Sequence, residues 1–362
     1  MKNSLELGRP FGIKLGIHWT FILLIAWVVA VDLMRGRTLA ETLITILFVL
    51  VLFVCVVMHE YGHALVAKKY GYPTKSITLL PIGGMANITK MPEKPKQELL
   101  ITGAGLAVNI VIAAALWGII STTGGMSVQN LSFEAITWNN FLVLLMAVNI
   151  LLVIFNLIPA FPMDGGRLLR AILSFRMNRE KATKIAMLSG QAFGVIFVFG
   201  GIFVNPFLVI IGIFVFIGAR MEYEEVRSKS VLEGYTVYDA LMKKYTKLNP
   251  GEKLKNAVDV MLDTHEESFL VAENDKILGL LTKKDIIKGL SEYGESGEID
   301  RVMRTTFESL RPDMPLLQAF EILKRNKSEV LPVFKDNHLE GVLDMDNVQE
   351  FMQVKSAIKE HK

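Results

Sequence analysis

The chain carries Leu43-Ile-Thr-Ile-Leu-Phe-Val-Leu-Val-Leu-Phe-Val-Cys-Val-Val-Met58 and continues directly into His59-Glu60-Tyr61-Gly62-His63. The apolar run is long enough to be embedded in a membrane. Histidines at positions i and i+4 share one face of a helix, so they can offer two nitrogen ligands to one zinc ion. Ionisable groups that face lipid cost on the order of 3 kcal/mol each at a helix centre, so their presence here indicates a functional site.

Glu60 follows the first histidine and is placed to take a proton from water at the metal. The alternative is a polar helix end in which Glu60 and both histidines are simply hydrated. The apolar run before the motif, with no helix cap between them, favours the metal site. A zinc site that hydrolyses a bond needs three protein ligands and one open position for water. The third ligand must therefore come from elsewhere in the chain.

The composition is that of a membrane protein. Of the 362 residues, 51% are hydrophobic and 21% are charged, and the mean hydropathy is +0.39, which predicts several membrane spans. Apolar runs fill the chain to about Arg220, whereas Lys, Asp and Glu crowd the remainder. We therefore expect a membrane domain over residues 1–222 and a soluble domain over residues 223–362. The net charge of +3, without a basic stripe, argues against a nucleic-acid partner.

Six membrane spans can be drawn from the apolar runs, the last of them short for a bilayer. Lys and Arg concentrate in residues 68–96 and again in residues 167–184. By the positive-inside rule both termini are then cytoplasmic, and we expect a multi-pass protein of a prokaryotic plasma membrane. The predicted spans are Ile17–Met34, Thr42–Val66, Leu99–Ser121, Ile136–Leu157, Ile185–Val204 and Pro206–Gly218.

Asp164 is the strongest candidate for the third ligand. It lies at the end of the fourth span, which runs in the same direction as the second, so its carboxylate is expected at the depth of the two histidines. Pro159 and Pro162 interrupt the helix, and the two glycines after Asp164 permit unusual backbone dihedrals. The alternative is a turn aspartate where the chain leaves the membrane.

Residues Ser76–Ile88 read as two short β runs around Gly83-Gly84. One interpretation is an amphipathic hairpin that lies in the membrane interface. The other is an edge strand that pairs with an unwound substrate, because an exposed sheet edge is a template for an extended peptide.

The chain resembles the site-2 proteases, a family of intramembrane zinc metalloproteases, and specifically the branch with C-terminal CBS domains. The resemblance covers essentially the whole chain and is carried by the His59–His63 motif, by Gly83-Gly84, and by Asn156-Leu-Ile-Pro-Ala-Phe-Pro-Met-Asp164-Gly-Gly. It implies that His59, His63 and Asp164 bind zinc, that Glu60 is the general base, and that Asn156 holds substrate or the oxyanion. An asparagine in a membrane helix can equally hydrogen-bond a neighbouring helix.

In the third span the family often has Gly-Pro before an asparagine. Here Gly103-Ala-Gly-Leu-Ala-Val-Asn109 lacks the proline, which leaves the role of Asn109 open. Cys55, one turn before His59, is expected to be a small buried core residue rather than a redox modulator. As the single cysteine, it excludes an internal disulfide. His18 is expected to be an interfacial histidine, with a gating or ligand role as the minority interpretation.

The soluble part contains an internal repeat. Pro250, Ala257 and Gly279 recur as Pro312, Ala319 and Gly341, each pair 62 residues apart. Each copy predicts a helix, two short strands and a second helix, so the two α/β units should pack on one another through their apolar sheet faces. The resemblance implies that these units are a tandem CBS domain, with repeats over about residues 236–291 and 298–353. We expect such a pair to mediate a homodimer.

The segment Gly279-Leu-Leu-Thr282-Lys-Lys-Asp285 resembles the CBS signature for an adenine nucleotide, ATP or AMP. In it the Thr282 hydroxyl would hold phosphate and the Asp285 carboxylate would hold ribose. The second copy replaces them with Asp344 and Asn347, and a carboxylate repels phosphate, so one nucleotide site at most is expected. The alternative is a CBS pair that only mediates dimerisation or substrate docking.

The predicted function is hydrolysis of a peptide bond within or near a transmembrane segment of a membrane-protein substrate. The substrate helix must unwind first, because its carbonyls are held in backbone hydrogen bonds. A CBS-gated metal ion transporter or channel shares the layout but does not explain a glutamate between two zinc-spaced histidines. An inactive scaffold would require a lost ligand, and no ligand is missing from the motif.

Overall fold

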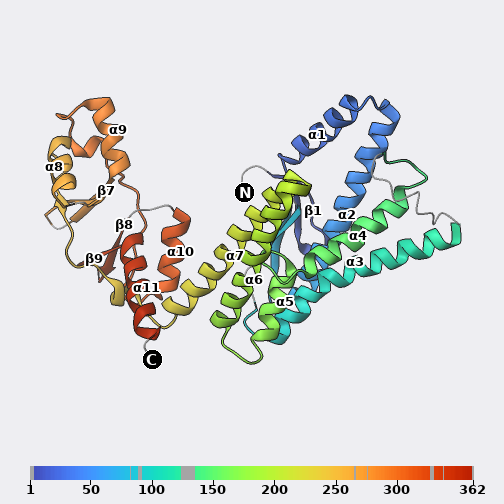
Figure 1. Cartoon of the computed structure of the whole chain (residues 1–362). Helices are drawn as coiled ribbons and strands as arrows, with labels where there is room; N and C mark the ends of the chain where they lie inside the picture. Colours follow the sequence, from blue (N-terminus) through green and yellow to red (C-terminus); the bar gives the residue numbers. More distant parts are fainter. Residues whose placement is uncertain are drawn as a thin grey trace. The chain divides into compact units, whose positions relative to one another are not determined.

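The computed structural model describes residues 4–81, 83–88, 92–123, 135–264, 266–274, 276–326, 330–336 and 338–360. The chain divides into two compact units, Met1–Glu224 and Glu225–Lys362, and each unit has its own core. The first unit holds apolar helices and one small sheet, and the second holds two β-hairpins with flanking helices (Figure 1).

Helix α2 (Leu39–Lys69) carries the histidine motif and is fixed at both ends. At its start the Glu41 carboxylate accepts from the Thr38 backbone N–H at 2.8 Å, and the Glu41 N–H donates to the Thr38 hydroxyl, which is a capping box. At its end Gly71 takes a positive φ of 85°, a conformation that turns the chain out of the helix at no cost to a glycine.

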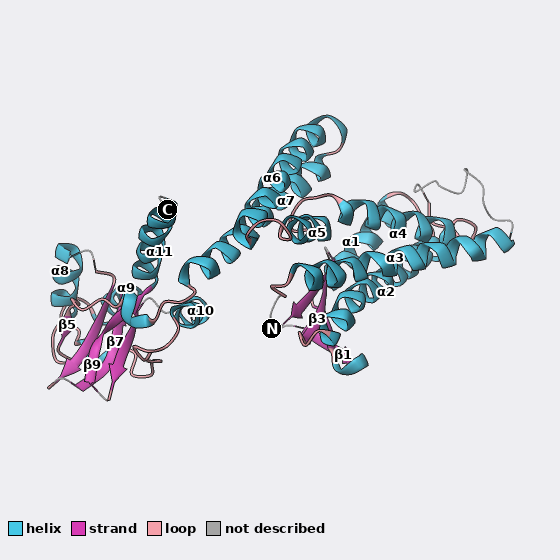
Figure 2. Ribbon diagram, turned by 90° about the horizontal axis from the view of Figure 1, so that it is seen from below, coloured by secondary structure: helices cyan, strands magenta, loops and turns pink. Residues whose placement is uncertain are grey.

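A four-stranded sheet covers one face of α2. Its strand order is β1-β2-β3-β4, with β2 and β3 parallel and the outer pairs antiparallel. Ile77 of β3 is buried together with Ile13, Tyr61 and Ala64, so the sheet packs directly on the turn of α2 that carries the histidines (Figure 2). The strands are β1 (Ser4–Gly8), β2 (Lys14–His18), β3 (Thr74–Leu80) and β4 (Gly83–Ile88).

The prediction of two β runs around Gly83-Gly84 is therefore correct, but the expectation that the first span begins at Ile17 is wrong. Residues Lys14–His18 form β2 because their backbone pairs in parallel with β3, and α1 begins only at Phe21. The N-terminal segment thus contributes strands to the sheet before the chain enters its first helix.

Three further helices complete the core around α2. Phe48 and Cys55 of α2, Leu116 of α3 and Leu144 of α4 are buried in one apolar cluster, so α2, α3 and α4 pack together. Cys55 is buried there, as expected for a small core residue. The helices are α1 (Phe21–Met34), α3 (Pro95–Thr123) and α4 (Phe141–Leu157).

Helix α4 ends before the prolines, and a separate helix α5 (Asp164–Leu173) follows. Asp164 is therefore the first residue of α5 rather than the last of a span. Gly165 and Gly166 lie in ordinary helical backbone, so the expected unusual dihedrals are wrong. A Cβ on Gly165 would lie 2.1 Å from the Ile158 carbonyl oxygen, and one on Gly166 would lie 2.6 Å from the Phe161 nitrogen. These glycines let α5 fold back against the preceding loop.

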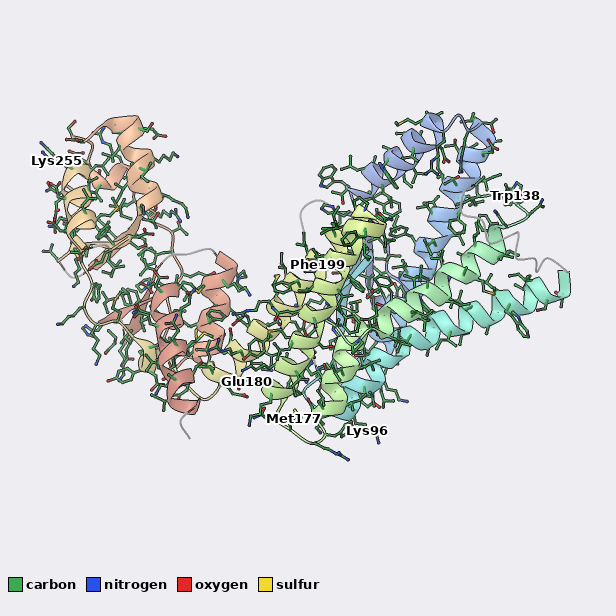
Figure 3. All side chains as sticks on the ribbon, in the orientation of Figure 1. Lys96, Trp138, Met177, Glu180, Phe199 and Lys255 are labelled. Atoms are coloured by element: carbon green, nitrogen blue, oxygen red, sulfur yellow. The ribbon has the colours of Figure 1, made fainter. Side chains whose placement is uncertain are left out.

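Helices α6 (Arg179–Val204) and α7 (Pro206–Leu232) form a hairpin that packs through glycines. A Cβ on Gly194 would lie 2.9 Å from the Gly212 carbonyl oxygen, which shows how closely the two backbones approach. Large apolar side chains point outward from the pair, including Phe199, which is 63% exposed and labelled in Figure 3. Exposed apolar surface of this kind suits contact with lipid.

Four helices are long and apolar enough to cross a membrane: α2, α3, α6 and α7. Helices α1 and α4 are apolar but shorter, with 14 and 17 residues. The predicted count of six spans is therefore not confirmed, although all six predicted segments are helical over most of their length.

In the second unit the predicted repeat is visible as two hairpins. The first copy pairs β6 with β7 and the second pairs β8 with β9, both antiparallel. Leu270 and Leu280 of the first copy and Val330 and Val342 of the second are buried in one cluster, so the two sheets pack face to face as expected. The elements are β5 (Lys247–Leu248), α8 (Leu254–Thr264), β6 (Ser268–Glu273), β7 (Lys276–Thr282), α9 (Lys283–Tyr293), α10 (Leu316–Asn326), β8 (Val330–Lys335), β9 (His338–Asp344) and α11 (Met345–Glu360).

The α6–α7 hairpin gives a test of this packing. A Cβ on Gly201 would lie 2.6 Å from the Val209 nitrogen, whereas the nearest atom to a Cβ on Gly200 is 4.0 Å away. Both Gly→Ala changes gain helix propensity, so their difference isolates the steric clash. We expect Gly201→Ala to lower the free energy of unfolding by about 1–3 kcal/mol relative to Gly200→Ala, measured by unfolding in detergent micelles. Equal stability of the two variants would contradict the close α6–α7 contact.

Candidate metal centre

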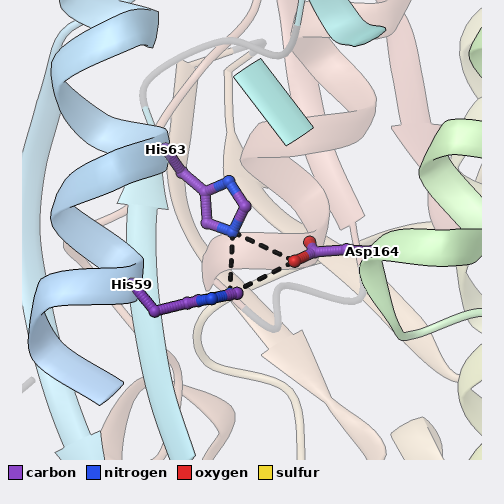
Figure 4. A group of neighbouring side chains, drawn as sticks. All are labelled: His59, His63 and Asp164. Carbon is purple, nitrogen blue, oxygen red and sulfur yellow. Dashed lines mark hydrogen bonds and ion pairs between the residues drawn. The ribbon is translucent and has the colours of Figure 1, made fainter. Parts of the chain in front are cut away.

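Three buried side chains converge between α2 and α5 (Figure 4). The His59 and His63 Nε2 atoms lie 3.0 Å apart, one helical turn from each other on α2. The Asp164 Oδ2 atom lies 3.2 Å from the His59 Nε2 and 3.1 Å from the His63 Nε2. We call these three atoms the ligand triangle. Its members are only 7–8% exposed, so the structure brings together the three residues that the sequence predicts as metal ligands.

Helix α3 sets the orientation of both imidazoles. The His63 Nδ1 lies 2.8 Å from the Ile101 carbonyl oxygen, and the His59 Nδ1 lies 3.2 Å from the Asn109 side-chain oxygen. Because an oxygen of this kind can only accept, each Nδ1 donates this hydrogen bond, which leaves each Nε2 as the nitrogen that can bind a metal ion. Outer hydrogen bonds of this type fix the ring of a metal-binding histidine and raise its basicity.

The triangle has the donor set and the spacing of a zinc site. The Asp164 Oδ2 is buried beside the two Nε2 atoms of the triangle. With both lone pairs directed inward, three electron-donating atoms face one another and need a cation between them. Ligand atoms about 2.0–2.1 Å from a tetrahedral zinc lie about 3.3 Å apart, close to the observed separations. The residues present therefore fit zinc.

Gly105 of α3 lies directly against the imidazoles. A Cβ at this position would lie 2.2 Å from the His63 Cε1 and Nε2 atoms and 2.9 Å from the His59 Cε1. Only a residue without a side chain leaves the rings where they are. No motif in the sequence marks Gly105 or Ile101 as a site residue. Asn109 is recognisable in the sequence as a polar residue in an apolar helix. The sequence does not reveal that its partner is His59.

Glu60 lies beside the triangle and is half-buried. It interacts electrostatically with His59, His63 and Asp164. On its other side is β4, because a Cβ on Gly84 would lie 2.6 Å from the Glu60 Cγ. The carboxylate is thus held between the ligand triangle and the last strand of the sheet.

The other candidates of the first unit lie at different places. Asn156 is half-buried in the last turn of α4, and its amide forms no hydrogen bond with the described residues. The His18 Nδ1 lies 2.8 Å from the Thr20 hydroxyl, next to the start of α1. The ligand triangle does not include His18.

In the second unit Thr282 and Asp285 lie side by side at the start of α9. The Thr282 hydroxyl donates to the Asp285 Oδ2 at 2.7 Å, in a capping box. Arg304 faces both residues, and its Nη2 lies 3.0 Å from the Asp285 Oδ1 and 3.4 Å from the Thr282 hydroxyl. The carboxylate expected to hold ribose is therefore paired with an arginine that lies outside the predicted signature segment.

The corresponding position of the second copy is acidic. Asp344 lies beside Asn347, whose N–H donates to the Asp344 Oδ1 at 2.7 Å. Burial raises the pKa of the Asp344 carboxyl. A cavity of about 560 Å³ next to it is lined by further carboxylates, those of Glu266, Glu267, Asp346 and Glu350.

Comparison with known proteins identifies the family of the chain. Residues 47–197 match peptidase family M50, and residues 237–292 and 297–353 each match a CBS domain. The chain is 36% identical over 284 residues to a zinc metalloprotease of Methanocaldococcus jannaschii, with 78% of each chain covered. A relative from Synechocystis is 28% identical over 381 aligned positions and covers 99% of this chain and 97% of its own length. A solved site-2 protease from M. jannaschii has 37% identity and a TM-score of 0.46, with 61% of this chain and 95% of that one covered.

The chain belongs to peptidase family M50, the site-2 protease family. It is a multi-pass zinc metalloprotease with a C-terminal CBS domain pair, which confirms the fold class and the family inferred from the two membrane motifs.

The contact of Gly105 with the imidazoles yields a direct test. We expect Gly105→Ala to displace His63 and to weaken zinc binding by at least about tenfold, the effect usually seen when a group that orients a metal ligand is removed. Zinc is measured by atomic emission on the purified protein and by competition with a chelator. Gly103→Ala is the matched control, because a Cβ there has no neighbour within 4 Å. Equal zinc affinity of the two variants would show that Gly105 does not confine the ligands.

Proposed function

We propose that this metalloprotease hydrolyses a peptide bond within or near a transmembrane segment of a membrane-protein substrate. The observation that supports this most directly is the ligand triangle of His59, His63 and Asp164 on helices of the membrane unit. These three residues are the proposed metal ligands. Zinc held by them would polarise a peptide carbonyl and lower the pKa of a water molecule.

Glu60 is the proposed general base. Its carboxylate takes a proton from the attacking water and returns the proton to the leaving amine. Its place beside the triangle supports this role. Asn156 is the proposed donor to the oxygen that gains negative charge in the transition state. Asn156 lies eight residues before Asp164, and its amide forms no hydrogen bond within the described part of the chain, which supports that assignment.

The substrate must reach the site as an extended strand. Strand β4 is the last strand of the sheet, and its outer edge has no partner strand within the described part of the chain. Gly84 of this strand contacts Glu60, so a peptide added to the edge would lie close to the proposed base. Edge addition supplies backbone hydrogen bonds to a segment that has lost its helical ones.

The proposed location is a prokaryotic plasma membrane, with both termini in the cytoplasm. Lys96 lies in the first turn of α3 and the exposed Trp138 lies just before α4, at opposite ends of this antiparallel helix pair (Figure 3). Tryptophan is common at both membrane interfaces, whereas lysine is enriched on the cytoplasmic side. The cluster Lys68, Lys69, Lys75, Lys94 and Lys96 supports a cytoplasmic position for that end.

Residues 1–222 are the proposed protease domain, and residues 223–362 are the proposed regulatory domain. The regulatory domain is proposed to bind one ATP or AMP at Thr282 and Asp285. Arg304 supports this site, since a guanidinium beside the Thr282 hydroxyl can turn to a phosphate and release the Asp285 carboxylate to ribose.

The carboxylates around Asp344 disfavour a second nucleotide. Exposed apolar side chains on α8, α9 and α11 support dimerisation through the CBS pair: Leu262, Ile287, Val354 and Ile358.

Replacement of Glu60 by Gln tests the protease mechanism. We expect Glu60→Gln to lower turnover by about 10²–10⁴-fold, since general base catalysis is lost, while zinc stays bound. Comparative membrane proteomics of cells with wild type or Glu60→Gln should reveal transmembrane proteins that accumulate uncut. Asp164→Asn is the companion variant and should lose both zinc and cleavage. Unchanged cleavage by Glu60→Gln would show that Glu60 is not the general base. No cleavage by the wild type and undisturbed metal transport in both proteins would favour the CBS-gated transporter, whose path does not depend on a base.

Nucleotide binding is tested on the full-length protein in detergent. We expect AMP or ATP to raise the melting temperature of the wild type by mass action, and Asp285→Ala to abolish the shift. Asp346→Ala, in the acidic second copy, should retain it. If neither nucleotide shifts the wild type, the CBS pair acts only in assembly or docking. A shift that survives Asp285→Ala and fails in Asp346→Ala would place the site in the other copy.

A further inference from the structure

A buried cluster of ionised side chains lies outside the ligand triangle. Arg170 of α5 has no exposed surface, and Glu98 of α3 is 2% exposed. The Arg170 Nε donates to the Glu98 Oε1 at 2.8 Å, and its Nη1 donates to the Glu222 Oε1 of α7 at 2.8 Å. Arg179, at the start of α6, donates to the second Glu98 oxygen at 2.8 Å. Arg170 was predicted to be one of the charges of a cytoplasmic loop, but in the structure it is buried.

The cluster joins α3, which orients the two imidazoles, to α5, which presents the carboxylate. Helix α3 contains Glu98 and also the groups that orient the imidazoles, namely the Ile101 carbonyl and the Asn109 amide. Helix α5 contains Arg170 and begins with Asp164. The Glu98–Arg170 pair therefore connects the support of the two nitrogen ligands to the helix that presents the oxygen ligand.

A short helix needs such an anchor. Helix α5 has only ten residues, which is too short to be stable by itself. The Arg170 guanidinium also lies over the Phe161 ring, 4.9 Å from its centroid, in the loop that leads to Asp164. A guanidinium offers donors in a rigid planar fork, so it fixes distance and angle where an apolar contact would allow helices to slide.

We infer that Arg170, with Glu98 and Glu222, is a positioning residue of the metal centre: the three side chains form a buried clamp that sets the position of Asp164 relative to the two imidazoles. The inference rests on the proposed ligand roles of His59, His63 and Asp164. Arg170 contacts neither metal nor substrate. Its effect on catalysis comes through the geometry of the ligand triangle.

The test measures zinc affinity and melting temperature of the full chain in detergent. We expect Arg170→Lys and Glu222→Gln to raise the zinc dissociation constant by about 10–100-fold, the usual loss when ligand support is removed. Arg176→Gln, an exposed arginine six residues further along, is the matched control and should keep the wild-type constant. Zinc should also raise the melting temperature of both clamp variants less than that of the wild type.

The zinc dissociation constant and the melting temperature together distinguish positioning of the metal centre from a purely structural role. A purely structural role would lower the melting temperature of the zinc-free and zinc-loaded forms equally and leave the dissociation constant unchanged, which overturns the inference. If Arg170→Lys does not fold, Glu222→Gln decides, because the Glu222 side chain is 21% exposed and its loss leaves the Glu98–Arg170 pair in place. If the wild type itself binds no zinc, the proposed ligands are wrong and the inference fails with them. Zinc binding by the wild type with an unchanged dissociation constant in both clamp variants overturns the inference alone.

Discussion

The membrane unit is arranged around one constraint: two imidazole nitrogens and one carboxylate oxygen must be held close together in a buried site. Electron-donating atoms 3.0–3.2 Å apart, shielded from water, repel one another unless a cation lies between them. The helices must therefore hold the three groups together against a repulsion that metal binding removes. Each of the three ligands is held by a different group. The Ile101 carbonyl orients His63, the Asn109 amide orients His59, and helix α5 positions Asp164.

Glycines allow the backbones around the site to approach the reactive side chains closely. Gly105 lies against the imidazoles, Gly84 against Glu60, and Gly165 against the loop before Asp164, and in each case a Cβ would overlap its neighbour. The backbones of α3, β4 and α5 thereby come close enough to confine the reactive groups without polar side chains that would compete for the metal. The same device packs α6 on α7, where apolar burial offers little driving force between helices in lipid.

The two CBS copies share a fold and differ in charge. In the first copy the Asp285 carboxylate is neutralised by Arg304, so one cation and one anion are available to a ligand that carries both phosphate and ribose. In the second copy Asp344 has no such partner among the described contacts, and the adjacent cavity is lined by carboxylates. The repeat thus keeps the apolar face that binds the two sheets together, while its polar positions have diverged. Function follows those polar positions, because the shared core only supplies the scaffold.

The sequence by itself determined what is local. The zinc spacing in α2, the apolar helices, the β runs at Gly83-Gly84 and the repeat of the second unit follow from periodicity and motif, and Asp164 followed from the resemblance joined to the direction of the spans. Tertiary structure alone decided the pairing of β2 with β3, the separate helix α5 and the partner of Asn109. It also decided that Arg170 pairs with Glu98, 72 residues away. Such contacts depend on how helices are placed against one another, and no pattern along a single segment contains that information.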